Sequence, residues 1–155
     1  MNKRRLTLML GFVLAGHAAL LRAQTVVGTI RRVGVLAPST RANEEITLRP
    51  FFEQMRQLGW IEGQNITYDR VYADDQLQRL PALAAELVAR KPELIYAPPT
   101  PSALAAKQAT DAIPIVFGAV WDPVSTGLVA SLARPGGNVT GICVFAESLA
   151  PKRIQ

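Results

Sequence analysis

Histidine and cysteine are almost absent from this 155-residue chain, which has one of each, His17 and Cys143. Ser-His-Asp and Cys-His catalysis both need an imidazole to move a proton, and zinc sites are usually built on imidazole and thiolate ligands. Because His17 lies in a segment that we expect to be removed, the rest of the chain cannot hold such a site. A lone cysteine also excludes an internal disulfide. These absences close off the common hydrolytic and metal-dependent classes of enzyme, although enzymes without histidine exist. We predict no catalytic residues, no metal, no cofactor, and a protein that is not an enzyme.

The first 23 residues have the three-part order of a secretory signal peptide. Lys3, Arg4 and Arg5 form a positive start, the run 6–21 is almost wholly apolar, and cleavage is expected near Ala23. The apolar run is short for a transmembrane helix, although an uncleaved membrane anchor is the alternative interpretation. We predict a signal peptide at 1–23, one α/β lobe at 24–155 and a periplasmic location.

Positive charge is concentrated in the same leading segment. The whole chain has 17 basic and 12 acidic side chains, but four of the basic ones precede residue 24. The mature chain keeps 13 basic against 12 acidic side chains, a net charge of +1. Because no basic stripe remains, we predict no nucleic-acid partner.

Short apolar runs alternate with amphipathic segments along the rest of the chain. The apolar runs predict strands at 32–36, 66–72, 94–97, 113–117 and 139–144. The segments between them predict helices at 48–58, 80–91, 102–110 and 122–132, and one more from 147. Inner strands that are apolar throughout are typical of a parallel sheet covered on both faces. We predict an α/β fold, a doubly wound parallel sheet in the flavodoxin-like order 2-1-3-4-5.

Three loops at the carboxyl ends of the predicted strands form the candidate binding region, because ligands bind there in open parallel sheets. They are the loops at 37–40, 98–102 and 119–123. Two of them place a capping residue before a proline, as Thr100-Pro101 and Asp122-Pro123. Each following helix would then direct free N–H groups at the crevice, which suits a carboxylate or another small anion.

Each candidate side chain also has a purely structural explanation. Thr100 and Asp122 could serve only as helix caps, although Asp122 could equally pair with a ligand ammonium. Trp121 could stack on a ligand or could be a core aromatic at a strand end. Gly136-Gly137-Asn138 precedes a strand and is therefore not a phosphate loop.

Several longer segments have a more specific pattern. The run 57–66 reads QLGWIEGQNI, and the stretch 122–141 contains DPV, GLV and SLARPGGNVTG. Together with 80–88, 100–107 and 113–117, these segments resemble one family of ABC-transporter substrate-binding proteins, sometimes linked to aromatic amino acid uptake. The resemblance covers residues 31–155 and implies a periplasmic binding protein of the type I-like fold.

The resemblance implies a two-lobed, monomeric protein that closes on a small solute and delivers it to an ABC permease in the inner membrane. The implied solute is an amino acid or a related carboxylate. Thr100 and Ser102 would bind its carboxylate and Asp122 its ammonium, while Ser39 and Trp121 would line the pocket.

Members of this family have a second lobe of similar size, whereas this chain ends at Gln155. We therefore expect an N-terminal lobe only, as a fragment or a truncated gene product, with half of the cleft. The alternatives are an exported α/β enzyme and a ligand-binding sensory lobe. The shortage of histidine argues against the first, and the second would require a membrane span downstream.

Overall fold

The structure is a computed structural model that describes residues 29–144 of the chain. The predicted signal peptide at 1–23 and the helix expected from 147 lie outside the described residues. In the described part, none of the helices is both long and apolar enough to cross a membrane.

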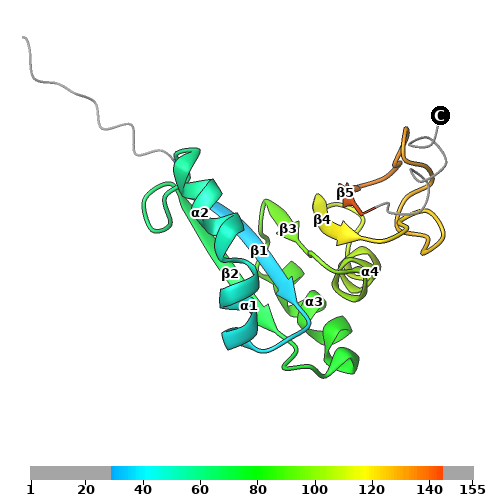
Figure 1. Cartoon of the computed structure of the whole chain (residues 1–155), viewed down its shortest axis with the longest axis horizontal. Helices are drawn as coiled ribbons and strands as arrows, with labels where there is room; N and C mark the ends of the chain where they lie inside the picture. Colours follow the sequence, from blue (N-terminus) through cyan, green and yellow to red (C-terminus); the bar gives the residue numbers. More distant parts are fainter. Residues whose placement is uncertain (1–28, 145–155) are drawn as a thin grey trace, which may run out of the picture.

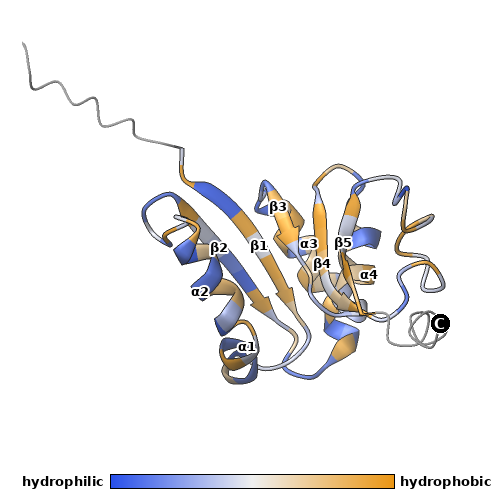
Figure 2. Cartoon of the chain, turned by 45° about the horizontal axis from the view of Figure 1, so that its top comes forward, coloured by the Kyte–Doolittle hydropathy of each residue, from blue (hydrophilic) through white to orange (hydrophobic). Residues whose placement is uncertain are grey.

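Five parallel strands form a sheet in the order β2-β1-β3-β4-β5, which confirms the predicted fold (Figure 1). The strands are β1 Arg31–Ala37, β2 Ile66–Tyr72, β3 Leu94–Tyr96, β4 Ile115–Val120 and β5 Val139–Cys143. β1 lies inside the sheet, because it pairs with β2 over seven residues and with β3 over three. The inner strands β3 and β4 are largely hydrophobic (Figure 2), as expected for strands covered by helices.

Helices cover both faces of the sheet, and each face has its own cluster of buried hydrophobic residues. The helices are α1 Arg41–Thr47, α2 Arg49–Gln57, α3 Leu80–Ala89 and α4 Thr100–Ala109, with a short 3-10 helix η1 Leu77–Arg79 before α3. Phe51 and Phe52 of α2 pack with Val35 on one face. Leu87 of α3 packs with Leu36 on the other. Val35 and Leu36 are neighbours in β1, so their side chains point to opposite faces of the sheet.

The contact between α3 and the sheet depends on a residue without a side chain. Leu87 is fully buried, and a Cβ added at Gly34 of β1 would lie 2.8 Å from its Cδ2. Any larger residue at position 34 would force α3 away from β1. Gly34 therefore sets how closely this helix approaches the sheet.

The sequence predicts one helix at 48–58, whereas the structure has two consecutive helices, α1 and α2, that meet at Leu48. Thr40 caps α1, because its Oγ1 accepts a hydrogen bond from the N–H of Asn43 at 3.4 Å. Pro50 lies in the first turn of α2 and has no N–H to continue the ladder. The apolar periodicity missed α1 because its only buried side chain is the charged Glu44.

The helix predicted at 122–132 is wrong, because the structure has turns there. Gly127 has a φ of +73°, and its N–H donates to the carbonyl of Val124 at 2.9 Å, which closes a tight turn. Ser125 and Thr126 before it have weak helix propensity. Leu128 and Val129 are nevertheless buried. The spacing of apolar residues in this segment therefore reflects the burial of Leu128 and Val129 and does not indicate a helix.

Candidate functional site

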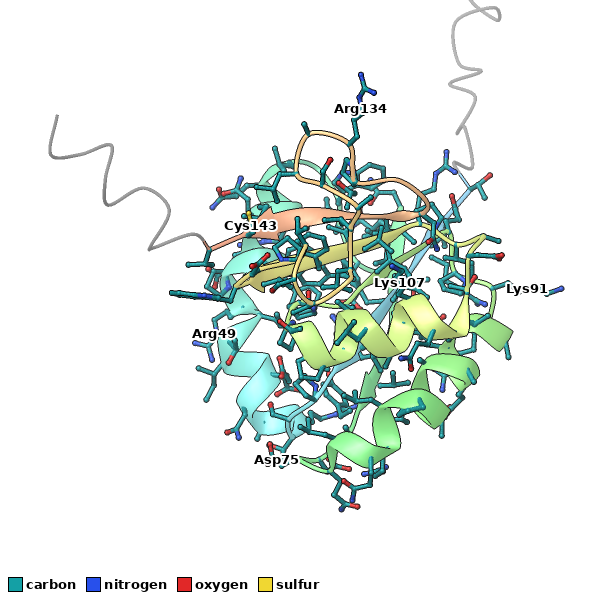
Figure 3. The ribbon with its side chains drawn as sticks, turned by 90° about the vertical axis from the view of Figure 1, so that its right-hand side faces the viewer. Arg49, Asp75, Lys91, Lys107, Arg134 and Cys143 are labelled. Carbon is teal, nitrogen blue, oxygen red and sulfur yellow. The ribbon has the colours of Figure 1, made fainter. Side chains whose placement is uncertain are left out.

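The loops after β1, β3 and β4 leave the sheet at its carboxyl edge, as the sequence predicts. In Figure 3, Cys143 marks the carboxyl end of β5 on the left, and Lys91, just before β3, marks the opposite end. Parallel strands bring all these loops to one side. The predicted site residues follow β1 (Ser39), β3 (Thr100 and Ser102) and β4 (Trp121 and Asp122).

Ser39 follows β1 and is held by a buried carboxylate. Its Oγ donates a hydrogen bond to Oε1 of Glu44 at 2.8 Å. Glu44 lies in the first turn of α1 with only 7% of its surface exposed. No cationic side chain forms an ion pair with it anywhere in residues 29–144. A buried carboxylate without a cation is rare, since burial of an isolated charge is costly.

The first turn of α4 lies next in the crevice, after β3. The helix begins at Thr100, with Pro99 at the N-cap and no side-chain cap. The prediction that Thr100 caps this helix is therefore wrong, because the capping position lies one residue earlier. The hydroxyl of Ser102 is fully buried and has no hydrogen-bond partner among the described residues. The first-turn N–H groups of a helix lack intrahelical acceptors and favour an anion.

The exit from β4 is irregular. Its pairing with β5 shifts register between Phe117 and Val120, and Ala119 between them has a φ of +53°. A left-handed conformation is uncommon for a residue with a Cβ, and such strain often lies at functional sites. Trp121 follows directly with 54% of its surface exposed. The structure therefore rules out a core position for Trp121 in this lobe.

Asp122 caps the turn that follows. Its Oδ1 accepts hydrogen bonds from the N–H groups of Val124 at 3.1 Å and Ser125 at 3.0 Å. The N–H of Ser125, with help from its hydroxyl and from the N–H of Val124, lowers the pKa of the Asp122 carboxyl below its usual value. The capping part of the prediction is confirmed, but the capped element is a turn.

We expect Asp122→Ala to loosen the loop at 122–130, because the N–H groups of Val124 and Ser125 lose their acceptor. Hydrogen exchange of these two amides, followed by NMR, should become faster, while the matched Asp122→Asn change should retain most of the protection. Because the folded pKa of Asp122 lies below its value of 3.8 in an unfolded chain, its stabilising effect is present above that pH. This stabilising effect is lost as pH falls through the folded pKa of Asp122. Equal exchange of the two amides in the wild type, Asp122→Ala and Asp122→Asn would contradict the capping role.

Two residues of this region escaped the sequence analysis, Glu44 and Tyr96. Tyr96 ends β3 and stacks on Phe51 of α2, with ring centroids 4.4 Å apart. Burial raises the pKa of its hydroxyl, and the charge of Glu44 raises that pKa further. A Cβ at Gly118 of β4 would lie 2.9 Å from the Tyr96 hydroxyl oxygen. Glu44 and Tyr96 therefore belong to one region at the carboxyl ends of β1, β3 and β4.

A separate cavity lies between α1–α2 and the edge strand β2. It has a volume of about 610 Å³, and its lining includes Leu48, Phe52, Trp60 and Tyr68. Only Glu44 belongs both to this cavity and to the region around Ser39. The described residues contain no group of three or more His, Cys, Asp or Glu side chains that could hold a metal ion.

Comparison with known sequences identifies a family and a relative. The sequence profile of the family described as ABC transporter substrate binding protein matches residues 32–155. A tyrosine-binding protein of Clostridioides difficile (strain R20291) is 45% identical over 91 residues. That alignment covers 59% of this chain and 26% of the relative.

Solved structures of similar proteins share the fold. A ligand-free, open substrate-binding protein with adhesive properties from Clostridium difficile has a TM-score of 0.70 and 33% identity over 81% of this chain. A domain of an ABC protein from Streptococcus pneumoniae in complex with L-Trp has a TM-score of 0.68 and 25% identity over 74% of this chain. The chain spans 43% of the first structure and 39% of the second, less than half of each.

Proposed function

We propose that this chain, which belongs to the ABC transporter substrate binding protein family, forms the N-terminal lobe of a protein that binds an aromatic amino acid for import. The family consists of binding proteins and not enzymes, and its members act outside the cytoplasm. The chain spans less than half of its solved relatives. The complete cleft, the permease and the solute are therefore part of the proposal.

The proposal also covers export and the extent of the lobe. The positive start at Lys3, Arg4 and Arg5, followed by the apolar run 6–21, supports a signal peptide with cleavage near Ala23. Residues 24–155 would then form the lobe in the periplasm. A second lobe would close over the carboxyl edge of the sheet, as expected for a two-lobed binding protein.

The first turn of α4 is the proposed site for the solute carboxylate. Thr100 and Ser102 are its first and third residues, and Pro101 between them has no N–H. A carboxylate placed here would accept from the free N–H groups and face the positive end of the helix. The Ser102 hydroxyl is fully buried and has no acceptor among the described residues, so it would have to turn toward the solute to bind it.

The observation that carries the proposal is the buried carboxylate of Glu44. It has the Ser39 hydroxyl as hydrogen-bond partner and no cation in the described part of the chain. A solute ammonium would supply the missing positive charge. Asp122, to which the sequence analysis assigned the ammonium, already uses Oδ1 as a cap. We therefore assign the ammonium to Glu44, with Ser39 holding the carboxylate in place.

Two aromatic side chains support an aromatic solute. Trp121 is exposed at the exit from β4, and Tyr96 ends β3 close to Glu44. Aromatic rings favour offset or edge-to-face contact with other rings. Two relatives support an aromatic amino acid as the solute, because one is a tyrosine-binding protein and another was solved with L-Trp.

Isothermal titration and thermal melts of the protein completed with its second lobe, with L-tyrosine and L-tryptophan as ligands, test the function. We expect both to bind, with a stability gain of about 2.7 kcal/mol at a hundredfold excess over Kd. Tyramine lacks the carboxylate and 3-(4-hydroxyphenyl)propionate lacks the ammonium, so both should bind more weakly. An absence of binding by every aromatic amino acid would contradict the proposed solute class.

Matched variants test the assignment of the ammonium. We expect Glu44→Gln to weaken L-tyrosine binding by about tenfold or more, because a charged hydrogen bond is lost. Binding of 3-(4-hydroxyphenyl)propionate should change little, since it has no ammonium. Asp122→Asn keeps the cap and should have the smaller effect. The opposite ranking of the two variants would return the ammonium to Asp122.

A further inference from the structure

A row of alternating charges runs along the exposed side of α1 and α2. Arg41, Glu45, Arg49 and Glu53 follow one another at intervals of four residues, and all four are exposed. Side chains four apart on a helix are neighbours. None of the four takes part in an ion pair within residues 29–144. Arg41 lies over the ring of Tyr72, 5.6 Å from its centroid, but no carboxylate or cation in the described residues neutralises the four charges.

The row continues across the junction of the two helices. The N–H of Leu48 donates to the carbonyl of Glu44 at 2.8 Å, and the N–H of Phe52 donates to the carbonyl of Leu48 at 3.1 Å. Leu48 itself has right-handed helical angles. α1 and α2 thus follow one another almost as a single helix, and the spacing of four residues holds along the whole row.

The order of the charges is complementary to itself when reversed. If a second copy is placed antiparallel about a two-fold axis, Glu45 faces Arg49 of the other copy, and Arg41 faces its Glu53. Every contact then joins opposite charges, and each contact occurs twice.

We propose that the row formed by Arg41, Glu45, Arg49 and Glu53 is the surface through which two copies of this chain associate. A strongly acidic or strongly basic partner would meet two like charges in this row, whereas a second copy meets none. The interface replaces the monomer expected from the sequence. It is independent of the proposed solute.

Apolar groups beside the row give the interface more than charge. Ile46 is 65% exposed, although it lies next to Glu45 at the centre of the row. The four residues of the row also line the cavity of about 610 Å³ between α1–α2 and β2, in which Phe52 and Trp60 are apolar members of a mostly charged lining. A second copy would cover both. The surface lies at the β2 end of the sheet, away from β5 (Figure 1). It borders the loop after β1, because α1 begins at Arg41 and Glu44 also lines the cavity.

Sedimentation equilibrium of the wild-type chain should show a reversible dimer that dissociates as salt is raised, because exposed charges are screened. Glu45→Arg and Arg49→Glu should each raise the dissociation constant by about tenfold or more. Each change places two like-charge contacts in the dimer instead of two attractive ones. The double variant with both changes should associate like the wild type.

Mixing the two single variants gives the sharpest result. The Glu45→Arg chain has a centre with two positive side chains, and the Arg49→Glu chain has a centre with two negative ones. Alone, each should be monomeric. Mixed, they should form a one-to-one dimer, because every central contact again joins opposite charges. A charge pair within one helix cannot produce this result.

Arg134→Glu is the control, because Arg134 lies at an exposed loop away from the row (Figure 3) and should not affect association. Thermal melts followed by circular dichroism would verify that each variant is folded. A monomeric wild type at all concentrations would overturn the proposal. So would a dimer indifferent to both charge reversals, or a mixture of the two variants that stays monomeric.

Discussion

Replacing Gly141 with alanine should destabilise the protein by about 3 kcal/mol and detach β5 from the sheet. A Cβ at this position would lie 2.1 Å from the carbonyl oxygen of Phe117 and 2.6 Å from its ring. Phe117 is buried and pairs directly with Gly141 across β4 and β5. Relief would require the backbone to move, which breaks the ladder. Urea denaturation followed by circular dichroism measures the loss.

Gly118→Ala is the matched control for this substitution. Its added Cβ would meet the hydroxyl of Tyr96 at 2.9 Å, which is the far end of a side chain that can turn aside. The expected loss is about 1 kcal/mol. If the two glycine variants had equal midpoints, the close contact between Gly141 and Phe117 would be disproved.

Leu87→Ala should have the second large effect, a loss of about 3 kcal/mol of unfolding free energy. Leu87 is fully buried, and it fills the space above Gly34 where α3 approaches β1. Truncation leaves a cavity between the helix and the sheet. Denaturation with urea again reports the change, and exposed Leu77 offers a control, because Leu77→Ala should cost less than 1 kcal/mol.

The same contact can be tested by a double variant. Gly34→Ala alone should destabilise by overpacking, because its Cβ would lie 2.8 Å from Leu87. In the combination of Gly34→Ala with Leu87→Ala, the new methyl group enters the space that the leucine has left. We expect a coupling of about 1 kcal/mol or more in favour of the double variant. Strict additivity would show that the two residues do not share this space.

The sheet could be predicted because its strands are short apolar runs between residues that break regular structure. The strand predicted at 66–72 has the bounds of β2, Ile66–Tyr72. Parallel pairing and the order 2-1-3-4-5 followed from the alternation of strands and helices. These features depend on local pattern and on general rules of chain connection, both of which a single sequence contains.

A capping residue does not distinguish a turn from a helix, because both use the same hydrogen bonds to the N–H groups that follow. Asp122-Pro123 caps the N–H groups that follow it, whether or not a helix continues. Gly127, five residues later, has a φ of +73°, which ends the segment in a turn and not in a helix. Thr100 was misplaced by one residue, because Pro99 can also occupy the N-cap position. Such choices depend on the backbone that the surrounding loops allow.

The sequence predicted where the candidate loops lie in the sheet, and the binding roles of their residues stay predictions. Ser39, Thr100 and Trp121 follow strands at the expected edge. Glu44 could not be recognised, because its importance arises from burial beside Ser39 and Tyr96. A glutamate four residues into a helix is otherwise an ordinary surface residue. Only the packing of α1 over the end of β1 makes it exceptional.

The inner position of β1 also fixes the order in which the sheet can assemble. β1 is the first strand of the chain, yet its pairing partners are β2 and β3, and β3 ends at Tyr96. Both edges of β1 are therefore covered only once the chain as far as residue 96 is available to pair. The pairing of β1 with β3 joins Val33 to Leu94, 61 residues apart, whereas Ile95 pairs with Ile115 and Ile115 with Val139, 20 and 24 residues apart. The closure of β1 against β3 is therefore the pairing that we expect to form most slowly.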